Sequence, residues 1–337
     1  MRMSNSRSKQ PIIIFKNRAI GDSIISFGAL QYLKKFYPGE RIIYGVPEWI
    51  YPLYKNISSD AAEIISIDLS NLSGFIRTYT KLMRLRPKIV IELFQSGRGK
   101  KLGKILNMFR ASNLYFGNNH HVKDGSWNKT NIQRDMDGVR SHLKKIKQGS
   151  YLNFCPKISV NNPPEKKEEI ILGIVATRET KLWPISYYHQ LCQQILTDFP
   201  DVMIKIPVSN SMMDQRLKSE FLSFVQLENV KFCEVPLELL PQEIASARLY
   251  IGNDTGIKHL SIALGLTSIT LFGPEPPMEW HPYDSIIHRY FYIEGLECRV
   301  KTAHFCGLNK CDSMICLKNI EVDDVYNVVI KILRGDL

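Results

Sequence analysis

A polar turn between a predicted strand and a predicted helix is the first candidate site. The stretch YIGNDTGIKHLSIALG (250–265) begins with strand-type residues and ends with the small apolar residues of a helix. Asp254 and Thr255 are good N-cap residues, and Gly256 lets a ligand approach the backbone. The free N–H groups and the helix dipole would attract an anion, toward which His259, one turn further on, could also point. The alternative is structural: Asp254 and Thr255 only cap the helix, and His259 lies on the surface.

Asp22 is the second candidate, at the start of the helix predicted from RAIGDSIIS. The preceding strand is expected to end at Lys16, and Gly21 permits a tight turn. A carboxylate at a helix N-terminus is expected to be ionised. It can accept a proton from a hydroxyl late in a displacement, when attack has already acidified that group. Considered in isolation, a simple helix cap explains Asp22 better.

Cations follow the strand predicted at 170–176. Arg178 and Lys181 stand in the loop sequence ATRETKLWPIS, at the carboxyl end of that strand. A cation in this place can stabilise a leaving diphosphate, and Thr177 of the same loop is a further candidate for contact with such a donor. The alternative is that both charges are ordinary solvated loop residues.

One short acidic motif is predicted to have no site function. Asp135 and Asp137 match the Asp-x-Asp pattern that holds a metal–nucleotide complex, but three residues match it often by chance. The motif stands beside the basic segment VRSHLKKIK, and we expect a polar loop. The sequence contains no Walker A loop, no G-x-G-x-x-G, no HExxH and no G-x-S-x-G.

The hydrophobic pattern predicts the elements that position these residues. In the first half we expect strands at 12–16, 41–46, 62–68 and 88–94, and helices at 21–39 and 72–85. A Pro-, Asn- and charge-rich segment, 155–168, is typical of a linker. In the second half we expect strands at 170–176, 201–208, 230–235, 248–253 and 267–273, and helices at 185–200, 212–226, 237–247, 256–264 and 322–335.

Strands separated by helix-length crossovers predict parallel sheets with helices on both faces. We therefore expect an α/β protein of two doubly wound, Rossmann-like domains, 1–160 and 161–337, that face each other across a cleft. The final helix, 322–335, belongs to the second domain, with the alternative that it packs back on the first. Ligands of such sheets bind beyond the carboxyl ends of the strands.

The charge of the chain is divided unevenly. The net charge is +11, but residues 1–160 carry +17 and residues 161–337 carry −6. A basic half favours phosphate-rich partners such as nucleic acid, anionic lipid or a phosphorylated glycan, and a merely solubilising surface is the equally good alternative. No apolar run approaches the roughly 20 residues of a membrane span, so we expect a cytoplasmic protein.

Cysteines gather near the C-terminus. Cys298, Cys306, Cys311 and Cys316 are spaced by eight, five and five residues, which is not the close C-x-x-C pairing typical of zinc sites. We predict no metal site, and the role of these four residues is left open. The seven cysteines of a cytosolic chain should mostly be reduced.

Taken together, the motifs resemble glycosyltransferase family nine, the lipopolysaccharide heptosyltransferases. The resemblance rests on IIIFKNRAIGDSIISFGALQYLKKFYP, on Lys181-Leu-Trp-Pro, on DTGIKHLSIALG and on LFGPEPPMEWHPYD, which occur in the family's order and spacing over nearly the whole chain. Lys258 departs from the pattern, because the family has a small or apolar residue between Gly256 and His259.

The resemblance implies a GT-B architecture and an inverting, metal-independent transfer from a nucleotide-diphosphate sugar, usually ADP-heptose, without a cofactor. Asp22 would then be the catalytic base in an acceptor-binding first domain. The donor, in the second domain, would be held by Thr177, Lys181, Asp254, Thr255, Gly256 and His259.

A phosphorylated glycolipid at the anionic inner face of a membrane would suit the basic first domain, which could associate with that face peripherally. Acceptor-binding candidates are Arg18, Arg98 and Lys101, the last two in the basic segment SGRGKKLGK, for which a solvated charged face is the alternative.

Two other functions remain open at this stage. One keeps the fold but changes the reaction, to a nucleotide-sugar epimerase or hydrolase of GT-B type, which would release nucleotide without an acceptor. The other is a non-catalytic binder whose basic half engages nucleic acid or another anionic ligand. Nucleic acid is not the expected partner, because the chain lacks aromatic–basic interleaving and any recognisable nucleic-acid motif.

Overall fold

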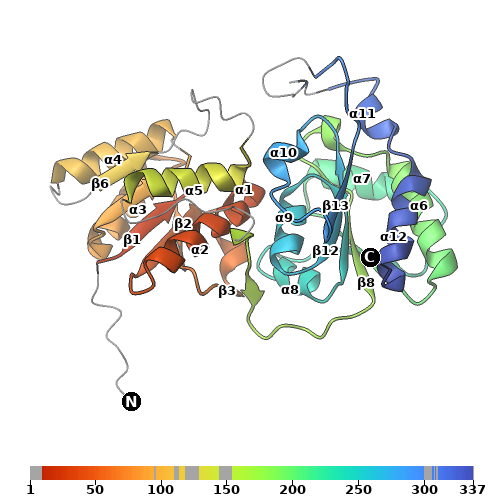
Figure 1. Ribbon diagram of the computed structural model, residues 1–337, viewed down its shortest axis with the longest axis horizontal. Helices are drawn as coiled ribbons and strands as arrows, with labels where there is room; N and C mark the ends of the chain where they lie inside the picture. The colour runs from red at the N-terminus through yellow and green to blue at the C-terminus, as the bar shows by residue number, and fades with distance from the viewer. Residues whose placement is uncertain are drawn as a thin grey trace. The chain divides into compact units, whose positions relative to one another are not determined.

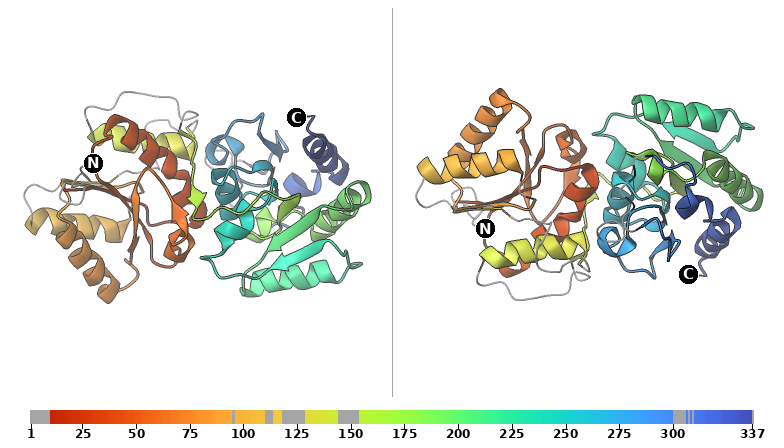
Figure 2. Two further views of the ribbon diagram at one scale, coloured as in Figure 1. Left: turned by 90° about the horizontal axis from the view of Figure 1, so that it is seen from below. Right: turned by 90° about the horizontal axis from the view of Figure 1, so that it is seen from above.

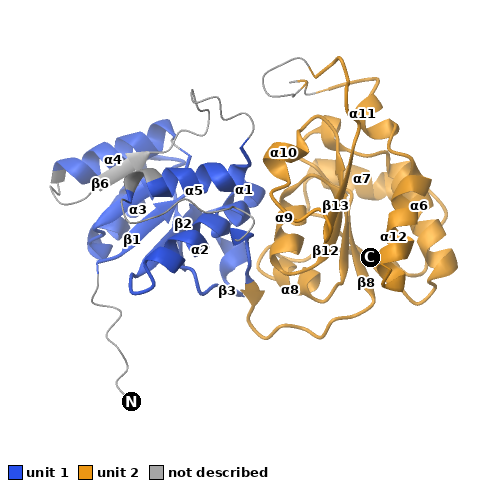
Figure 3. Ribbon diagram, in the orientation of Figure 1, with its two compact units in different colours: residues 1–158 blue, residues 159–337 orange. Residues whose placement is uncertain are grey.

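The computed structural model describes residues 10–94, 96–109, 114–117, 129–143, 154–299, 306, 308 and 310–336. The chain divides into two compact units, Met1–Ile158 (unit 1) and Ser159–Leu337 (unit 2), at a point within the predicted linker (Figure 3). Each unit is a parallel sheet with helices on both faces (Figures 1 and 2), which confirms the predicted fold class. Of the helices in the described residues, none combines the length and apolarity needed to span a bilayer.

Unit 1 contains a five-stranded parallel sheet in the order β4-β2-β1-β5-β6. Its strands are β1 (Ile12–Phe15), β2 (Ile42–Pro47), β4 (Glu63–Ile67), β5 (Ile89–Glu92) and β6 (Leu114–Gly117), with a two-residue strand β3 (Ile57–Ser58) outside the sheet. Its helices are α1 (Ile20–Ile25), α2 (Phe27–Phe36), α3 (Leu72–Leu85), α4 (Gly97–Phe109) and α5 (Asn131–His142), with a 3-10 turn at Tyr51–Tyr54. The central strand β1 reads IIIF and is wholly buried, as expected for a strand covered on both faces.

Helices α2 and α5 cover one face of this sheet, and α3 and α4 cover the other (Figure 2). On the α3 and α4 side, Ile13 and Phe15 of β1 pack with Leu82, Leu102 and Leu106. This apolar core supports the end of the sheet from which the polar loops leave the strands.

Unit 2 contains a six-stranded parallel sheet in the order β10-β9-β8-β11-β12-β13. Its strands are β8 (Glu169–Gly173), β9 (Met203–Pro207), β10 (Val230–Cys233), β11 (Leu249–Asn253), β12 (Thr267–Phe272) and β13 (His288–Tyr292), with a two-residue strand β7 (Ser159–Val160) outside it. Its helices are α6 (Ile185–Asp198), α7 (Met212–Leu222), α8 (Leu240–Ala245), α9 (Gly256–Ala263), α10 (Pro277–Trp280), α11 (Ile315–Lys318) and α12 (Val322–Arg334), with a 3-10 turn at Glu179–Lys181.

Helices α6, α7 and α12 lie on one face of the second sheet, and α8 and α9 lie on the other (Figure 2). The final helix α12 packs against α6, and its Val325 and Val329 are fully buried in the core of unit 2. The helix therefore has its apolar stripe covered within unit 2.

Three further differences from the predicted elements concern unit 1. The helix expected at 21–39 is two helices that meet at Ser26, and the second ends at Phe36 because Tyr37, before Pro38, leaves the helical region. Helix α4 and strand β6 were not predicted. The segment with Asp135 and Asp137, expected to be a polar loop, lies in helix α5.

Each sheet has a point at which the strand order reverses. In unit 1 the reversal lies between β1 and β5, and in unit 2 it lies between β8 and β11. Loops that leave neighbouring strands in opposite directions open a crevice at such a point, where doubly wound proteins bind ligands. Asp22 follows β1, Lys181 follows β8 and Asp254 follows β11, so all three stand at these points.

Candidate functional site

The loops after β8 and β11 are joined by the side chain of Asn253. Asn253 is fully buried at the end of β11, where its Oδ1 accepts a hydrogen bond from the backbone N–H of Trp183 (3.0 Å) and its Nδ2 donates to the carbonyl oxygen of Ile174 (2.9 Å). The indole N–H of Trp183 donates to the carbonyl oxygen of Ile320 (3.0 Å). The strands themselves approach closely, since a Cβ on Gly252 would lie 2.5 Å from the carbonyl oxygen of Gly173. These contacts hold Lys181 beside Asp254.

Asp254 lies between two lysines. Its Oδ2 is 3.0 Å from Lys181 Nζ, and its Oδ1 is 2.5 Å from Lys258 Nζ. Lys258 is fully buried and also donates to the carbonyl oxygen of Trp280 (2.8 Å). Burial by itself would raise the pKa of Asp254, but Lys181 and Lys258 outweigh it and hold that pKa below its ordinary value. Burial lowers the pKa of Lys258 to about 8 in spite of its ion pair.

Glu275 adds a second carboxylate to the same corner. It pairs with Arg178, and its Oε1 lies 3.7 Å from Lys181 Nζ. Three cationic side chains (Arg178, Lys181 and Lys258) thus face two carboxylates (Asp254 and Glu275), which leaves an excess of positive charge. This corner, defined by these five residues and the N-terminus of α9, is called the cationic corner below. This excess of positive charge suits a diphosphate, whose oxygens could bind one or more of these cations in place of a carboxylate.

The cap interpretation of Asp254 and Thr255 is wrong. Thr255 is the N-cap residue of α9, but its side chain makes no capping hydrogen bond to the helix. The Asp254 carboxylate is instead committed to the two lysines. Thr255 and Gly256 are half-buried, so the first turn of α9 keeps backbone N–H groups that these side chains do not cap.

His259 is buried rather than on the surface. Its side chain is 3% exposed, its Nδ1 lies 2.5 Å from the hydroxyl oxygen of Tyr283, and its Nε2 lies 3.9 Å from Asp254 Oδ1. Burial, reinforced by the charge of Lys258, holds the pKa of His259 well below its ordinary value. At neutral pH the imidazole is therefore uncharged, and it can serve a ligand through an N–H group but not through a positive charge.

Two more histidines lie behind this corner. His281 donates from Nε2 to the carbonyl oxygen of His288 (2.8 Å), and its ring makes edge contacts with Phe272 and Tyr283. Burial lowers the pKa of His281 to about 3 and that of His288 to about 4. Both are neutral in the folded protein across the physiological range.

Unit 2 is expected to lose stability as the pH falls from about 6.5 to about 4. Histidine takes up a proton near pH 6.5 in the unfolded chain, whereas His281 does so only near pH 3 in the folded chain. The stability that depends on neutral His281 is therefore complete above pH 6.5 and declines by about 1.4 kcal/mol per pH unit below it. His281→Gln keeps an N–H donor for His288 and should flatten this slope. Urea unfolding at pH 4.5, 5.5, 6.5 and 7.5 measures it, and equal slopes in the two proteins would contradict the expectation.

In unit 1, α1 holds Asp22 at the carboxyl end of β1. The helix rests on two buried tyrosines: Tyr44 donates to the carbonyl oxygen of Ser23 (3.0 Å), and the hydroxyl of Tyr54 lies 2.5 Å from Ser23 Oγ. The Asp22 side chain is 13% exposed. Asp22 is thus fixed at its backbone while its carboxylate remains accessible.

Two cations flank the Asp22 carboxylate. Lys16 Nζ lies 3.8 Å and Arg18 Nε lies 3.9 Å from its Oδ1. Arg18 is 47% exposed and stacks its guanidinium 4.3 Å from the ring centre of Phe94, which belongs to the loop after β5. Lys16 is buried and also contacts both carboxylate oxygens of Asp135, at 3.0 and 3.2 Å. The simple helix-cap interpretation of Asp22 therefore omits its charged neighbours.

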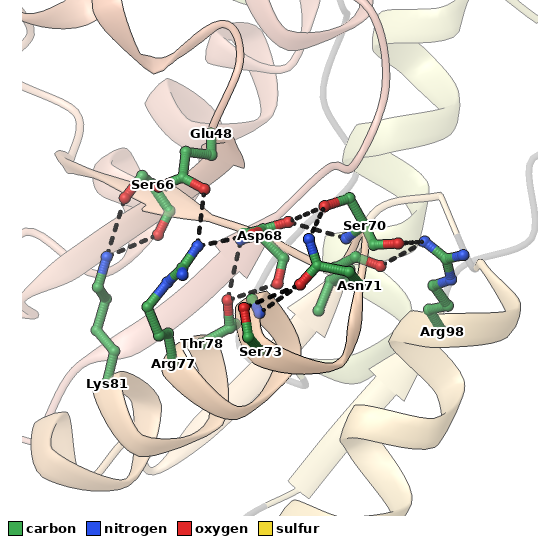
Figure 4. Close-up of polar contacts among 12 residues, drawn as sticks. Glu48, Ser66, Asp68, Ser70, Asn71, Ser73, Arg77, Thr78, Lys81 and Arg98 are labelled. Carbon is green, nitrogen blue, oxygen red and sulfur yellow. Dashed lines mark hydrogen bonds and ion pairs between the residues drawn. The ribbon is translucent and has the colours of Figure 1, made fainter.

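Arg98 has an evident structural task. Its guanidinium donates to the carbonyl oxygens of Leu69 (2.7 Å) and Ser70 in the loop after β4. Figure 4 shows Arg98 together with the polar network around this loop. In the same network Asn71 caps α3, and Asp68 accepts hydrogen bonds from the backbone N–H and the hydroxyl of Ser70. The Lys101 side chain is exposed on α4. Binding of an acceptor by Arg18, Arg98 and Lys101 stays a prediction.

The four C-terminal cysteines gather around one small pocket. Cys298, Cys306, Cys311 and Cys316 line it together with Arg299, and all are free thiols. Within the described residues, no group of three or more His, Cys, Asp or Glu is arranged to hold a metal ion. Burial raises the pKa of the Cys316 thiol, whereas the Ser313 hydroxyl lowers that of Cys311.

Four charged residues of these two sites were given no role by sequence reasoning. Lys258 carried a usable signal, because it stands four residues after Asp254 at the spacing of a helical ion pair. Asp135 also carried one, since Ile132, Met136 and Val139 recur with a helical period around it. Lys16 and Glu275 had none, because their partners Asp135 and Arg178 are distant in the sequence.

Comparisons with known proteins agree with this geometry. The chain is 26% identical to the lipopolysaccharide heptosyltransferase 1 of Campylobacter coli, over 96% of this chain and 99% of that protein. Its fold is similar to the solved Escherichia coli ADP-heptose LPS heptosyltransferase II, with a TM-score of 0.73 and 17% identity over 97% and 100% of the two chains. A family 9 glycosyltransferase from Veillonella parvula gives the same TM-score, with 17% identity over 99% of each chain. These folds are of the GT-B type.

The family model described as glycosyltransferase family 9 (heptosyltransferase) matches residues 129–306, more than half of the chain. That range includes the cationic corner in unit 2 and the helix that bears Asp135 in unit 1. With two doubly wound parallel sheets and charged loops at both points of strand reversal, the chain belongs to glycosyltransferase family 9, the heptosyltransferases.

Proposed function

We propose that this glycosyltransferase moves a heptose from ADP-heptose to a lipopolysaccharide inner-core acceptor, with inversion at the anomeric carbon and without a metal ion. The observation that carries the proposal is the cationic corner. Lys181 and Lys258 flank Asp254 next to the first turn of α9, and Arg178 forms an ion pair with Glu275 of the same corner. The Escherichia coli protein of similar fold is described as an ADP-heptose LPS heptosyltransferase, which supports the choice of donor.

In this proposal the cationic corner binds the diphosphate of the donor. As the glycosidic bond breaks, negative charge grows on the leaving diphosphate, and preorganised cations together with helix N–H groups stabilise that charge. Lys181 is 16% exposed and so can exchange a carboxylate partner for phosphate oxygens, whereas Lys258 is fully buried and acts on the charge of Asp254. These side chains supply the compensation for which other transferases use Mg²⁺.

Asp22 is the proposed base in unit 1. It accepts the proton of the acceptor hydroxyl as that oxygen attacks the anomeric carbon, while the sugar–phosphate bond breaks on the opposite side. In this proposal Arg18, which lies beside Asp22 and is half exposed, contacts a phosphate of the acceptor. The +17 charge of residues 1–160 would favour a phosphorylated glycolipid and a peripheral position at the anionic cytoplasmic face of the membrane.

A panel of nucleotide sugars tests the donor. At a free concentration about 100 times the Kd, a donor that binds only the folded protein adds about 2.7 kcal/mol to stability. ADP-heptose should therefore raise the unfolding temperature, whereas UDP- and GDP-sugars should not. The matched variant Lys181→Met should weaken this shift, and Lys218→Met, which removes a lysine that pairs with Glu234 away from the corner, should not.

Transfer assays test the rest of the proposal. Incubation with ADP-heptose and a lipid-A-linked acceptor should give product of inverted anomeric configuration, with a rate that EDTA leaves unchanged. Nucleotide release at the same rate without an acceptor would instead indicate a hydrolase or an epimerase. Absence of any shift with ADP-heptose, together with a shift by another sugar nucleotide, would overturn the choice of donor.

A further inference from the structure

The structure assigns a positioning role to a second charged pair in unit 1, and this inference rests on the proposed function. We propose that the positive charge of Lys16 holds the Asp22 base in position, and that Asp135 competes with Asp22 for the ammonium group of Lys16. Lys16 follows β1 directly, and its ammonium group is shared by two carboxylates: Asp135 at 3.0 and 3.2 Å and Asp22 at 3.8 Å.

Burial argues that this arrangement is more than a structural fastener. The side chains of Lys16 and Asp135 are 1% and 0% exposed, whereas that of Asp22 is 13% exposed. A buried ion pair contributes little net stability, because desolvation of both charges offsets their attraction, and apolar residues often serve as well. Here the buried pair lies next to Asp22, a more accessible carboxylate at the point of strand reversal, where a ligand is expected.

Asp135 also contacts the helix that carries Asp22. The hydroxyl oxygen of Ser26 lies 2.8 Å from Asp135 Oδ2 and 3.0 Å from the carbonyl oxygen of Asp22, and its single proton can serve one of them at a time. Ser26 is the residue at which α1 gives way to α2. Asp135 therefore acts on Asp22 in two ways, through the shared lysine and through the end of its helix.

The charged groups around Asp22 determine the sign of the expected effects. They are Lys16 from the end of β1, Arg18 from the following loop and Asp135 from α5, and Tyr44 of β2 also lies within electrostatic reach. Burial raises the pKa of Tyr44 well above its ordinary value, so Tyr44 contributes no charge. Loss of the Lys16 charge should therefore weaken the attraction that holds the Asp22 carboxylate in place, and loss of the Asp135 charge should leave the Lys16 ammonium group to Asp22 alone.

The competing explanation is that Lys16 only pairs with Asp135 to hold β1 to α5. Lys16→Met alone does not separate the two explanations, because it leaves Asp135 buried without its cation and destabilises unit 1 under either one. The double variant Lys16→Met/Asp135→Asn separates them. It removes both buried charges together, and the Asn side chain retains an acceptor oxygen for Ser26.

The experiment measures thermal unfolding, and kcat and KM for heptose transfer, in wild type, both single variants, the double variant and Asp22→Asn. We expect the double variant to recover most of the stability that Lys16→Met loses. Its kcat should still lie about tenfold or more below that of wild type, because Asp22 has lost the cation that holds its carboxylate, and a correctly held base contributes about 10²–10⁴-fold. Asp135→Asn alone keeps Lys16 beside Asp22 and should keep kcat within about tenfold of wild type, well above that of Asp22→Asn. The KM for the donor should be unchanged throughout.

A stable double variant with the wild-type kcat would overturn the inference and leave Lys16 a structural role. If the double variant does not fold, Asp135→Asn decides, because it keeps Lys16 beside Asp22. A folded Asp135→Asn variant with kcat as low as that of Asp22→Asn would overturn the inference. Failure of the proposed function looks different: wild type then transfers no sugar, or Asp22→Asn remains active, and the inference falls with it.

Discussion

Replacement of Asp22 by Asn is expected to lower kcat for heptose transfer by about 10²–10⁴-fold, the usual contribution of a general base. Asparagine keeps the shape of the side chain but cannot accept the proton of the acceptor hydroxyl. The affinity for the donor should change less than a few-fold, because the proposed donor-binding residues belong to unit 2 whereas Asp22 belongs to unit 1. Product formation from labelled donor measures kcat, and calorimetric titration of the donor measures affinity.

The matched control for this experiment is Asp60→Asn. Asp60 is an exposed acid of the same unit, and its replacement removes the same charge away from the site. This variant should keep wild-type kcat. An Asp22→Asn enzyme with kcat within tenfold of wild type would remove Asp22 from the role of base, even if transfer of heptose itself is confirmed.

Replacement of Asp254 by Asn should lower the free energy of unfolding of unit 2 by about 3–5 kcal/mol, the usual cost of removing one partner of a buried ion pair. The reason is Lys258, which is fully buried and has its Nζ 2.5 Å from Asp254 Oδ1. Addition of Lys258→Met should restore much of the lost stability, because no unpaired buried charge then remains. Urea unfolding measures both variants, and Asp201→Asn, at an exposed position of the same unit, should leave stability unchanged.

The pH dependence of this difference has a definite sign. The two lysines hold the pKa of Asp254 below its unfolded value of about 3.9, so the stabilisation is complete above about pH 4 and is lost as the pH falls further. The part of the gap between wild type and Asp254→Asn that comes from the ionised Asp254 should thus be lost below pH 4, and the gap should narrow there. A gap that does not narrow between pH 4 and pH 3 would show that Asp254 is not the ionised partner.

Local sequence patterns were sufficient for most of the fold. The apolar run IIIF of β1, helix α3 at the expected residues 72–85 and the strand–turn–helix at 250–265 follow from preferences that act within a few residues. Helix α5 shows where this failed. The charges of Asp135, Asp137 and the basic segment beside them favoured a loop, although Ile132, Met136 and Val139 already had the spacing of a helix with one apolar face.

The candidate residues were also found from sequence, but their surroundings were not. Asp22, Lys181, Asp254 and His259 attracted attention because acids, cations and a histidine stand where strands end. Considered one at a time, they were explained as well by helix caps or surface charges. The structure excludes these simpler explanations for two of the residues, both of which are buried. Asp254 lies between two lysines, and His259 is an uncharged ring that contacts Tyr283.

By itself, therefore, the sequence determined the alternation of strand and helix, the uneven charge of the two halves and the acids and cations at the carboxyl ends of strands. Only the tertiary structure decided which charges meet: Lys16 with Asp135 across 119 residues, and Arg178 with Glu275 across 97. The physical reason is that strand and helix preferences act over a few residues, whereas a parallel sheet brings together loops from distant parts of the chain. The energy of a charge then depends on burial and on partners that only this assembly supplies.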